Sequence, residues 1–276
     1  MMAGGVITPL LLDLYPNAAA AYSLRKLRNG YGGSAIRVRR SSDNAEQDIA
    51  FVSGNLDTAS LASFCFGTDG FVTTFYDQSG NNRNVIQTSA INQPQIVSFG
   101  NLILQNGRPV ISFTSNNKRL QSASNVSLVF IDATTSYVSR NVAQPADFNG
   151  MFGFGNNGQG SLIRYAGSAS NTNYGYSTFG SDYVSTISAT NDSSLALYSS
   201  KYTAFPNLAT LYKNATTQSG SPTTGGTISL GKFAINTIAD RNSSGTIFFS
   251  EGVFYAFNNS QILLIRDNQR LYYSIY

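Results

Sequence analysis

The sequence contains no histidine, no tryptophan and only one cysteine among its 276 residues. Without histidine, neither a Ser-His-Asp triad nor a Cys-His pair can form. A single thiol cannot close an intrachain disulfide, and one cysteine without histidine cannot supply the common zinc sites. Cys65 stands between Phe64 and Phe66, which indicates a buried apolar side chain rather than a nucleophile. We therefore predict no cofactor and no metal site.

Charged residues are also scarce, at 12% of the chain with a net charge of +4. The polar surface must then consist of Ser, Thr, Asn, Gln and Gly, as in extracellular and virion β-proteins or in a neutral soluble β-domain. The small positive excess does not predict nucleic-acid binding. No apolar stretch approaches the roughly 18 residues of a membrane span. The first 13 residues lack a basic signal-peptide start, so we expect synthesis in a cytoplasm.

Most of the chain reads as short strands separated by turns. Alternating or β-branched and aromatic segments predict strands at residues 35–39, 70–76, 109–113, 126–131, 150–155, 227–231, 246–250 and 251–257. Turn signals such as Asn106-Gly107 and Gly225-Gly226 separate them. Many short strands with such turns are typical of an all-β sandwich or barrel. The Ser- and Asn-rich stretch 161–200 predicts either a mobile loop system or several polar edge strands.

Three short helices interrupt this pattern. They are predicted at residues 18–28, from Asp57 as N-cap to about residue 64, and at residues 260–273. No Pro-rich or charged linker divides the chain. We expect an N-terminal arm over residues 1–15 and a single domain over residues 16–276.

Two groups of segments resemble known families. The succession Ala20-Ala21-Tyr22-Ser23-Leu24-Arg25, residues 36–43 and Phe75-Tyr76-Asp77-Gln78-Ser79-Gly80-Asn81-Asn82 resembles the N-terminal half of the α-L-arabinofuranosidase B catalytic domain. It is also similar to related modules in bacteriophage structural proteins and bacterial surface proteins. Residues 245–255 and 269–276 resemble the closing strand and helix of LamG-type domains. The resemblance implies a two-sheet jelly-roll sandwich of the concanavalin A-like kind.

The resemblance also implies a glutamate nucleophile in the middle of the domain, but this chain has none there. Glycoside hydrolysis requires two carboxylates across the scissile bond. The only glutamates are Glu46 and Glu251, and residues 149–239 contain just two acids, Asp182 and Asp192. We therefore expect no catalytic residue and a catalytically inactive relative of a glycoside hydrolase. Glu251 is interpreted as a structural residue that pairs with Arg266 or Arg270, the alternative being a carboxylate in a cleft.

Five residues are candidates for ligand binding: Asp77, Gln78, Asn82, Tyr174 and Tyr176. Tyrosine faces stack on the apolar faces of sugars, and amides offer both donors and acceptors to hydroxyls. Asp77 has the competing role of closing its turn by accepting backbone N–H bonds. The tyrosines have the competing role of a polar hairpin or a subunit contact.

Three functions are compatible with these observations. The first hypothesis is a non-catalytic phage virion structural protein, such as a head decoration, a head fibre or a tail-associated protein, located in the virion. Its partners would be other virion proteins, further copies of itself and possible surface glycans, without nucleic acid or membrane insertion. The alternatives are a free carbohydrate-binding module and an arabinofuranosidase-type glycoside hydrolase.

Overall fold

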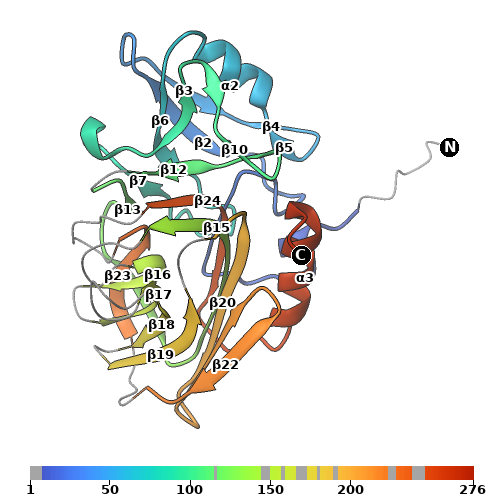
Figure 1. The fold of residues 1–276 in the computed structure, drawn as a ribbon, viewed down its shortest axis with the longest axis vertical. Helices are drawn as coiled ribbons and strands as arrows, with labels where there is room; N and C mark the ends of the chain where they lie inside the picture. Colours follow the sequence, from blue (N-terminus) through green and yellow to red (C-terminus); the bar gives the residue numbers. More distant parts are fainter. Residues whose placement is uncertain are drawn as a thin grey trace, which may run out of the picture.

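The computed structural model describes residues 8–114, 117–143, 150–156, 159–165, 173–178, 181–188, 192–222, 228–237 and 246–276 (Figure 1). The helices are α1 (Leu11–Leu14), α2 (Thr58–Phe64), α3 (Ile262–Tyr273) and a 3-10 turn at Ala90–Asn92. The strands are β1 (Ala20–Ser23), β2 (Ile36–Arg40), β3 (Glu46–Ile49), β4 (Phe51–Val52), β5 (Asn55–Leu56), β6 (Gly70–Phe75), β7 (Val85–Ile86), β8 (Gln95–Ser98), β9 (Asn101–Leu102), β10 (Leu104–Gln105), β11 (Arg108–Pro109), β12 (Ile111–Phe113), β13 (Leu120–Ser122), β14 (Val126–Phe130), β15 (Ala133–Ala143), β16 (Gly150–Asn156), β17 (Gln159–Tyr165), β18 (Asn173–Thr178), β19 (Ser181–Ser188), β20 (Ala196–Thr203), β21 (Leu208–Lys213), β22 (Thr216–Gly220), β23 (Ile228–Ile235) and β24 (Thr246–Tyr255).

The protein is all-β, with antiparallel pairing throughout the described strands and a few short helices, as the sequence predicts. β24 occupies the centre, where it pairs with β1, β12 and β15. From β15 the ladder continues through β20 and β21 to β22. A second run of strands leads from β23 through β16, β17 and β18 to β19. In Figure 1, α3 lies beside β20, while β2, β3 and β6 lie at the opposite end from β19 and β22.

The core is built from aromatic rings that these strands bring together. The rings of Tyr137 and Tyr198 stack with centroids 5.1 Å apart, and the ring of Phe249 stacks with that of Tyr137 at 6.1 Å. Phe152 contacts Phe249 at 5.7 Å and also lies edge-on to Tyr22. Such pairs add about 0.5–1.5 kcal/mol each beyond the area that they bury. β1, β15, β16, β20 and β24 are therefore locked to one another through a single aromatic cluster.

Most predicted elements are present, and two predictions are corrected. The helix predicted at residues 18–28 does not form. Residues 20–23 are the strand β1 instead, because all four side chains are buried and Ala20 and Ala21 pair with Phe254 and Val253 of β24. Tertiary pairing here outweighs the helix preference of alanine. Residues 246–250 and 251–257, predicted to be two strands, are the single strand β24. The helices after Asp57 and near the C-terminus are confirmed as α2 and α3.

The described parts of the 161–200 stretch form strands β17, β18, β19 and the first half of β20, so the strand alternative is correct for them. No helix in the described part of the chain is long and apolar enough to cross a membrane. Near the N-terminus, Leu11 and Leu12 are buried against Val253, Tyr255 and Ile265. The division into an arm and a domain stays a prediction.

Candidate functional site

Asp77 is a buried carboxylate that organises the turn after β6. Its Oδ1 accepts hydrogen bonds from the backbone N–H groups of Ala21 and Ser79, both at 2.9 Å. Its Oδ2 accepts from the Ser79 hydroxyl at 2.7 Å and from the Arg83 N–H at 3.0 Å. The predicted turn-forming role of Asp77 is confirmed, and the turn is tied to β1 by the same carboxylate. A role for Asp77 in ligand binding stays a prediction.

Gln78 is fully buried and bridges two segments of backbone. Its Oε1 accepts from the N–H of Leu27 at 2.8 Å, and its Nε2 donates to the carbonyls of Ser23 and Arg25. Asn82 is exposed at a positive φ of 56°. Asp77 and Gln78 use their polar atoms within the fold, so Asn82 is the member of this group whose side chain reaches solvent.

The two candidate tyrosines lie on β18. Tyr176 is buried, with its ring stacked on that of Tyr202 at 5.3 Å. The backbone of Tyr174 pairs with Tyr165 of β17, and its side chain lies outside the described part of the structure. Tyr176 is thus a core residue in this structure. Among the predicted ligand-binding residues whose side chains the structure describes, Asp77, Gln78 and Tyr176 are buried and Asn82 is exposed.

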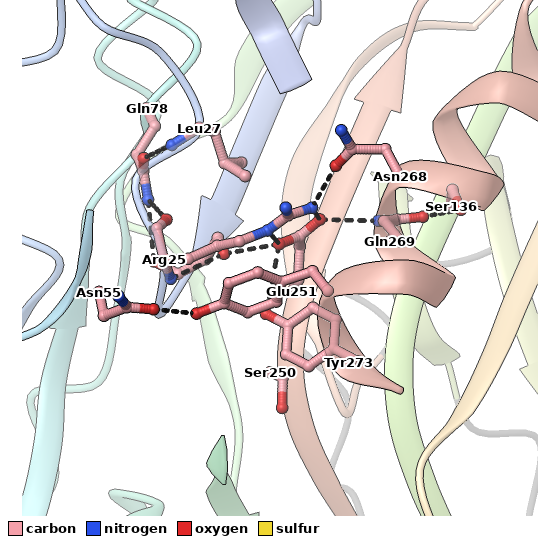
Figure 2. Close-up of polar contacts among 12 residues, drawn as sticks. Arg25, Leu27, Asn55, Gln78, Ser136, Ser250, Glu251, Asn268, Gln269 and Tyr273 are labelled. Carbon is pink, nitrogen blue, oxygen red and sulfur yellow. Dashed lines mark hydrogen bonds and ion pairs between the residues drawn. The ribbon is translucent and has the colours of Figure 1, made fainter. Parts of the chain in front are cut away.

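Glu251 is the centre of a buried polar network (Figure 2). Its carboxylate forms an ion pair with Arg25, with Nε to Oε2 at 2.7 Å and Nη2 to Oε1 at 2.9 Å. It also accepts hydrogen bonds from Ser23, Gln269 and Tyr273. The structural interpretation of Glu251 is confirmed, but the predicted partners Arg266 and Arg270 are wrong. Arg266 donates to Ser199 and to the Asn214 carbonyl, and Arg270 contacts Asp267.

The charges of this network depend on each other. Burial by itself raises the pKa of the Glu251 carboxyl, but the Arg25 guanidinium and the hydrogen bonds from Arg25, Ser23 and Gln269 bring the pKa below its ordinary value. Burial, reinforced by the Glu251 carboxylate, raises the pKa of the Tyr273 hydroxyl. A carboxylate held ionised and enclosed in this way stabilises the fold and does not face a substrate cleft.

Asp192 is the third carboxylate with little exposure, after Asp77 and Glu251. Its Oδ2 accepts from the Asn141 N–H at 3.0 Å and from the Tyr198 hydroxyl at 2.7 Å. Its Oδ1 forms an ion pair with Lys213 at 2.7 Å, and the Asp192 side chain is 6% exposed. Sequence reasoning singled out Asp192, but could not predict its partners on β15, β20 and β21. A carboxylate that is paired with a cation and accepts from a phenol can act as a nucleophile or as an electrostatic stabiliser in glycoside hydrolysis.

Asp182 lies far from Asp192. Lys213 Nζ, which contacts Asp192, also donates to the Ser188 carbonyl at 2.7 Å at the end of β19. Asp182 is six residues earlier on the same strand, where it pairs with Ser177. At about 3.3 Å per residue, a strand places the backbone of Asp182 about 20 Å from that of Ser188, which Lys213 contacts. Asp182 and Asp192 therefore do not form a pair at glycosidase separation.

The Asp192 carboxylate contacts β15 near its end, beside the start of β16. Asn141 on β15 donates its Nδ2 to the sulfur of Met151 on β16, and the Asn236 N–H donates to the Met151 carbonyl. Ala143 at the end of β15 pairs with Thr246 at the start of β24. Residues 144–149, between β15 and β16, and residues 238–245, between β23 and β24, lie outside the described residues. They contain Asp147 and Asp240, which sequence reasoning did not consider.

A polar groove of about 400 Å³ lies on the neighbouring strands β7 and β13. Its lining is mostly hydrogen-bonding, with Gln87, Thr88, Arg119, Gln121 and Ser122 around Ile86 and Ala123. Gln121 pairs with Ala234 of β23, two residues before Asn236. The volume is that of a typical small-molecule site. No group of three or more metal-binding side chains occurs within the described ranges.

Comparison with solved structures finds this all-β fold in other proteins. A GH54 α-L-arabinofuranosidase soaked with a cyclic sulfate inhibitor matches 91% of this chain with a TM-score of 0.67, covering 62% of that chain at 17% identity. The binding domain of Paraclostridial Mosquitocidal Protein 1 matches 72% of this chain with a TM-score of 0.51, covering 49% of that chain at 18% identity. At these identities the similarity concerns the fold.

The sequence gives the family. The family model "Alpha-L-arabinofuranosidase B, catalytic" matches residues 13–152, and the chain belongs to this family. The probable α-L-arabinofuranosidase B of Aspergillus flavus is 34% identical over 126 residues, which are 44% of this chain and 23% of the relative. The α-L-arabinofuranosidase of Hypocrea jecorina is 30% identical over 143 residues, or 49% of this chain and 27% of the relative. The chain thus matches about a quarter of the length of these curated relatives.

These findings correct the main functional hypothesis. The relatives are fungal α-L-arabinofuranosidases, which contradicts the assignment to a phage virion structural protein and to the virion. They also contradict the expectation of an inactive, non-enzymatic relative. The error arose because the missing mid-domain glutamate was given more weight than the arabinofuranosidase motifs at residues 20–25 and 75–82. The resemblance to the arabinofuranosidase B catalytic domain is confirmed.

Proposed function

We propose that this protein is a glycoside hydrolase that releases α-L-arabinofuranosyl groups. The observation that carries the proposal is the match of residues 13–152 to the arabinofuranosidase B catalytic family. The fold similarity to a GH54 α-L-arabinofuranosidase over 91% of the chain supports it. The hydrogen-bonding lining of the groove on β7 and β13 suits sugar hydroxyls.

The chemistry requires two carboxylates, about 5–5.5 Å apart for retention of configuration or 6.5–9.5 Å apart for inversion. Glu251 is unsuited, because its side chain is enclosed with Arg25 beneath α3. Asp192 is suited to the role of nucleophile, since Lys213 forms an ion pair with its carboxylate and the Tyr198 hydroxyl donates to it. Asp147 and Asp240 are the candidates for the proton donor, because the described ends of their segments flank Asn141 and Met151.

Turnover of 4-nitrophenyl α-L-arabinofuranoside by the purified full-length chain tests the proposal. We expect release of 4-nitrophenol by the wild type and a loss of about 10³-fold or more in kcat for Asp192→Asn. One of Asp147→Asn and Asp240→Asn should lose activity on this aryl glycoside and more strongly on an unactivated arabinofuranoside, as expected when a proton donor is removed. Asp182→Asn is the matched control and should retain wild-type turnover.

Two results would overturn the proposal. One is the absence of turnover by folded wild-type protein at high concentration. The other is turnover that persists unchanged in Asp192→Asn, Asp147→Asn and Asp240→Asn, since a contaminating enzyme would then be the source. Circular dichroism of each variant separates a loss of chemistry from a loss of fold, which matters for Asp192 because it also joins β15 to β20.

We further infer that the strands form the two-sheet jelly-roll sandwich implied by the family resemblance. The contact of Tyr22 on β1 with Phe152 on β16, and of Phe130 on β14 with Phe254 on β24, supports two layers of strands facing each other across an aromatic interior. A crystal structure of the full chain tests this inference. A closed barrel without two separate layers would contradict it.

A further inference from the structure

A second pocket borders the Glu251 network, since Tyr273 belongs to both. Its volume is about 160 Å³, and its walls come from β5, the start of α2, the β10–β11 turn and the end of α3. A cavity of about 150 Å³ accommodates benzene, so the space is that of one six-membered ring. The lining residues are Leu24, Asn55, Leu56, Thr58, Gly107, Arg108, Pro109, Tyr272 and Tyr273.

The wall of this pocket carries one cation with no opposite charge beside it. The Arg108 guanidinium lies over the Tyr272 ring, 4.3 Å from its centroid. Among the residues that the structure describes, no carboxylate forms an ion pair with Arg108. The nearby Arg25, 4.4 Å from the same ring, is neutralised by Glu251. Stacking on an aromatic face leaves the edge of the Arg108 guanidinium available for a planar anion.

Hydrogen bonds fix the surroundings of Arg108. The Tyr272 hydroxyl donates to Asn55 Oδ1, which joins α3 to β5 (Figure 2 shows Asn55 and Tyr273 beside the network). Asn106 Nδ2 donates to the Tyr273 carbonyl and joins the β10–β11 turn to α3. Gly107 has a φ of +70°, and a Cβ placed there would meet nothing within 4 Å. The turn therefore borders open space, while the aromatic wall is held in place.

We propose that this pocket binds a carboxylate carried on a single six-membered ring, with Arg108 as the anion-binding residue. The carboxylate would take the in-plane N–H donors of Arg108 as a two-point contact, which is the geometry that favours arginine over lysine. The ring would pack against Leu56, Pro109 and Tyr273. A uronic acid and an aromatic carboxylate share this chemistry. The proposal is independent of the hydrolase function, because it concerns a different part of the surface and is tested by binding.

Isothermal titration calorimetry of the full-length protein with glucuronate, benzoate and glucose tests the proposal. We expect saturable binding of at least one carboxylate. The affinity for glucose should be lower by about tenfold or more, because glucose lacks the anion. Binding of glucuronate alone would identify a site for an acidic sugar. Binding of benzoate alone would identify a site for an aromatic acid, and binding of both a general ring-carboxylate site. The absence of saturable binding of either carboxylate overturns the proposal.

Variants locate the binding. Arg108→Gln should lower the affinity for the carboxylate ligand by about tenfold. Arg108→Lys retains the charge without the planar guanidinium and should lower that affinity by about threefold. Lys201→Gln, on β20, removes one positive charge elsewhere and should leave the affinity unchanged. Equal affinity in wild type and Arg108→Lys, or an equal loss in Lys201→Gln, would overturn the assignment. If Arg108→Gln fails to fold, Arg108→Lys decides the question.

Discussion

At the scale of single residues, the buried Glu251 carboxylate has the largest consequences. It is fully enclosed with Arg25, and five hydrogen bonds from Arg25, Ser23, Gln269 and Tyr273 satisfy its oxygens. Removing one partner of such a pair leaves a buried charge without compensation, which typically costs about 3–5 kcal/mol. Replacing both partners with apolar residues has a much smaller effect, because no charge remains to be solvated.

The buried Glu251 carboxylate makes the free energy of unfolding depend on pH. Glu251 has a pKa below its ordinary value in the folded state, so its contribution is fully present above the unfolded pKa, near 4.5, and is lost as the pH falls through the folded value. Glu251→Gln should lower the free energy of unfolding at pH 7 by about 3 kcal/mol. It should also flatten the decline of stability below pH 4.5 relative to wild type.

Urea denaturation between pH 3 and pH 7 measures both effects. Asp267→Asn is the control, because its ion pair with Arg270 is exposed and such pairs contribute little. A Glu251→Gln variant with unchanged stability at pH 7 would show that the ion pair does not hold the strands together.

At the scale of elements, the turn after β6 depends on one side chain. Asp77 accepts four hydrogen bonds, three of them from backbone N–H groups of Ala21, Ser79 and Arg83. Asp77→Ala leaves these donors without their partner in a buried place, at about 1–3 kcal/mol for each unsatisfied group. We expect a loss of about 3 kcal/mol in the free energy of unfolding, and about half of that for Asp77→Asn, which keeps one acceptor oxygen.

Chemical denaturation of both variants measures the loss. Asn82→Gly is the matched control in the same turn, since Asn82 is exposed and glycine adopts its φ of +56° without strain. Equal stabilities for Asp77→Ala and Asn82→Gly would mean that the turn is held by other contacts.

At the scale of the whole molecule, the family-matched segment and the rest of the chain share one sheet. β1, β12 and β15 belong to residues 13–152, but each pairs with β24, and β15 also pairs with β20. A fragment ending at residue 152 would expose the edges of these strands and the aromatic cluster. Unpaired edges and exposed apolar faces favour aggregation over folding.

We therefore predict that residues 8–152 alone do not fold, whereas the full chain unfolds in one cooperative transition. Thermal unfolding followed by far-ultraviolet and near-ultraviolet circular dichroism measures both. A soluble fragment with its own cooperative transition would show that the matched segment is an autonomous domain.

Several features could be predicted from local sequence. The all-β class followed from short alternating and β-branched segments with turn residues between them, and α2 from Asp57 as N-cap, whose carboxylate does accept from the Ser60 N–H. The turn role of Asp77 and the burial of Cys65 were likewise correct, and burial raises the pKa of that thiol to about 11. Each of these depends on neighbours within a few residues.

The features of the fold and the candidate site that local sequence did not predict depend on contacts between distant segments. Arg25 and Glu251 are 226 positions apart, so no local pattern could select Arg25 over the nearer Arg266 and Arg270. Residues 18–28 were predicted to be helical from capping signals, but pairing with β24 makes residues 20–23 a strand. The meeting of Asn141, Met151 and Asp192 at one end of the strands also follows from pairing alone. The composition determined which chemistries are absent, while tertiary packing determined which of the remaining side chains meet.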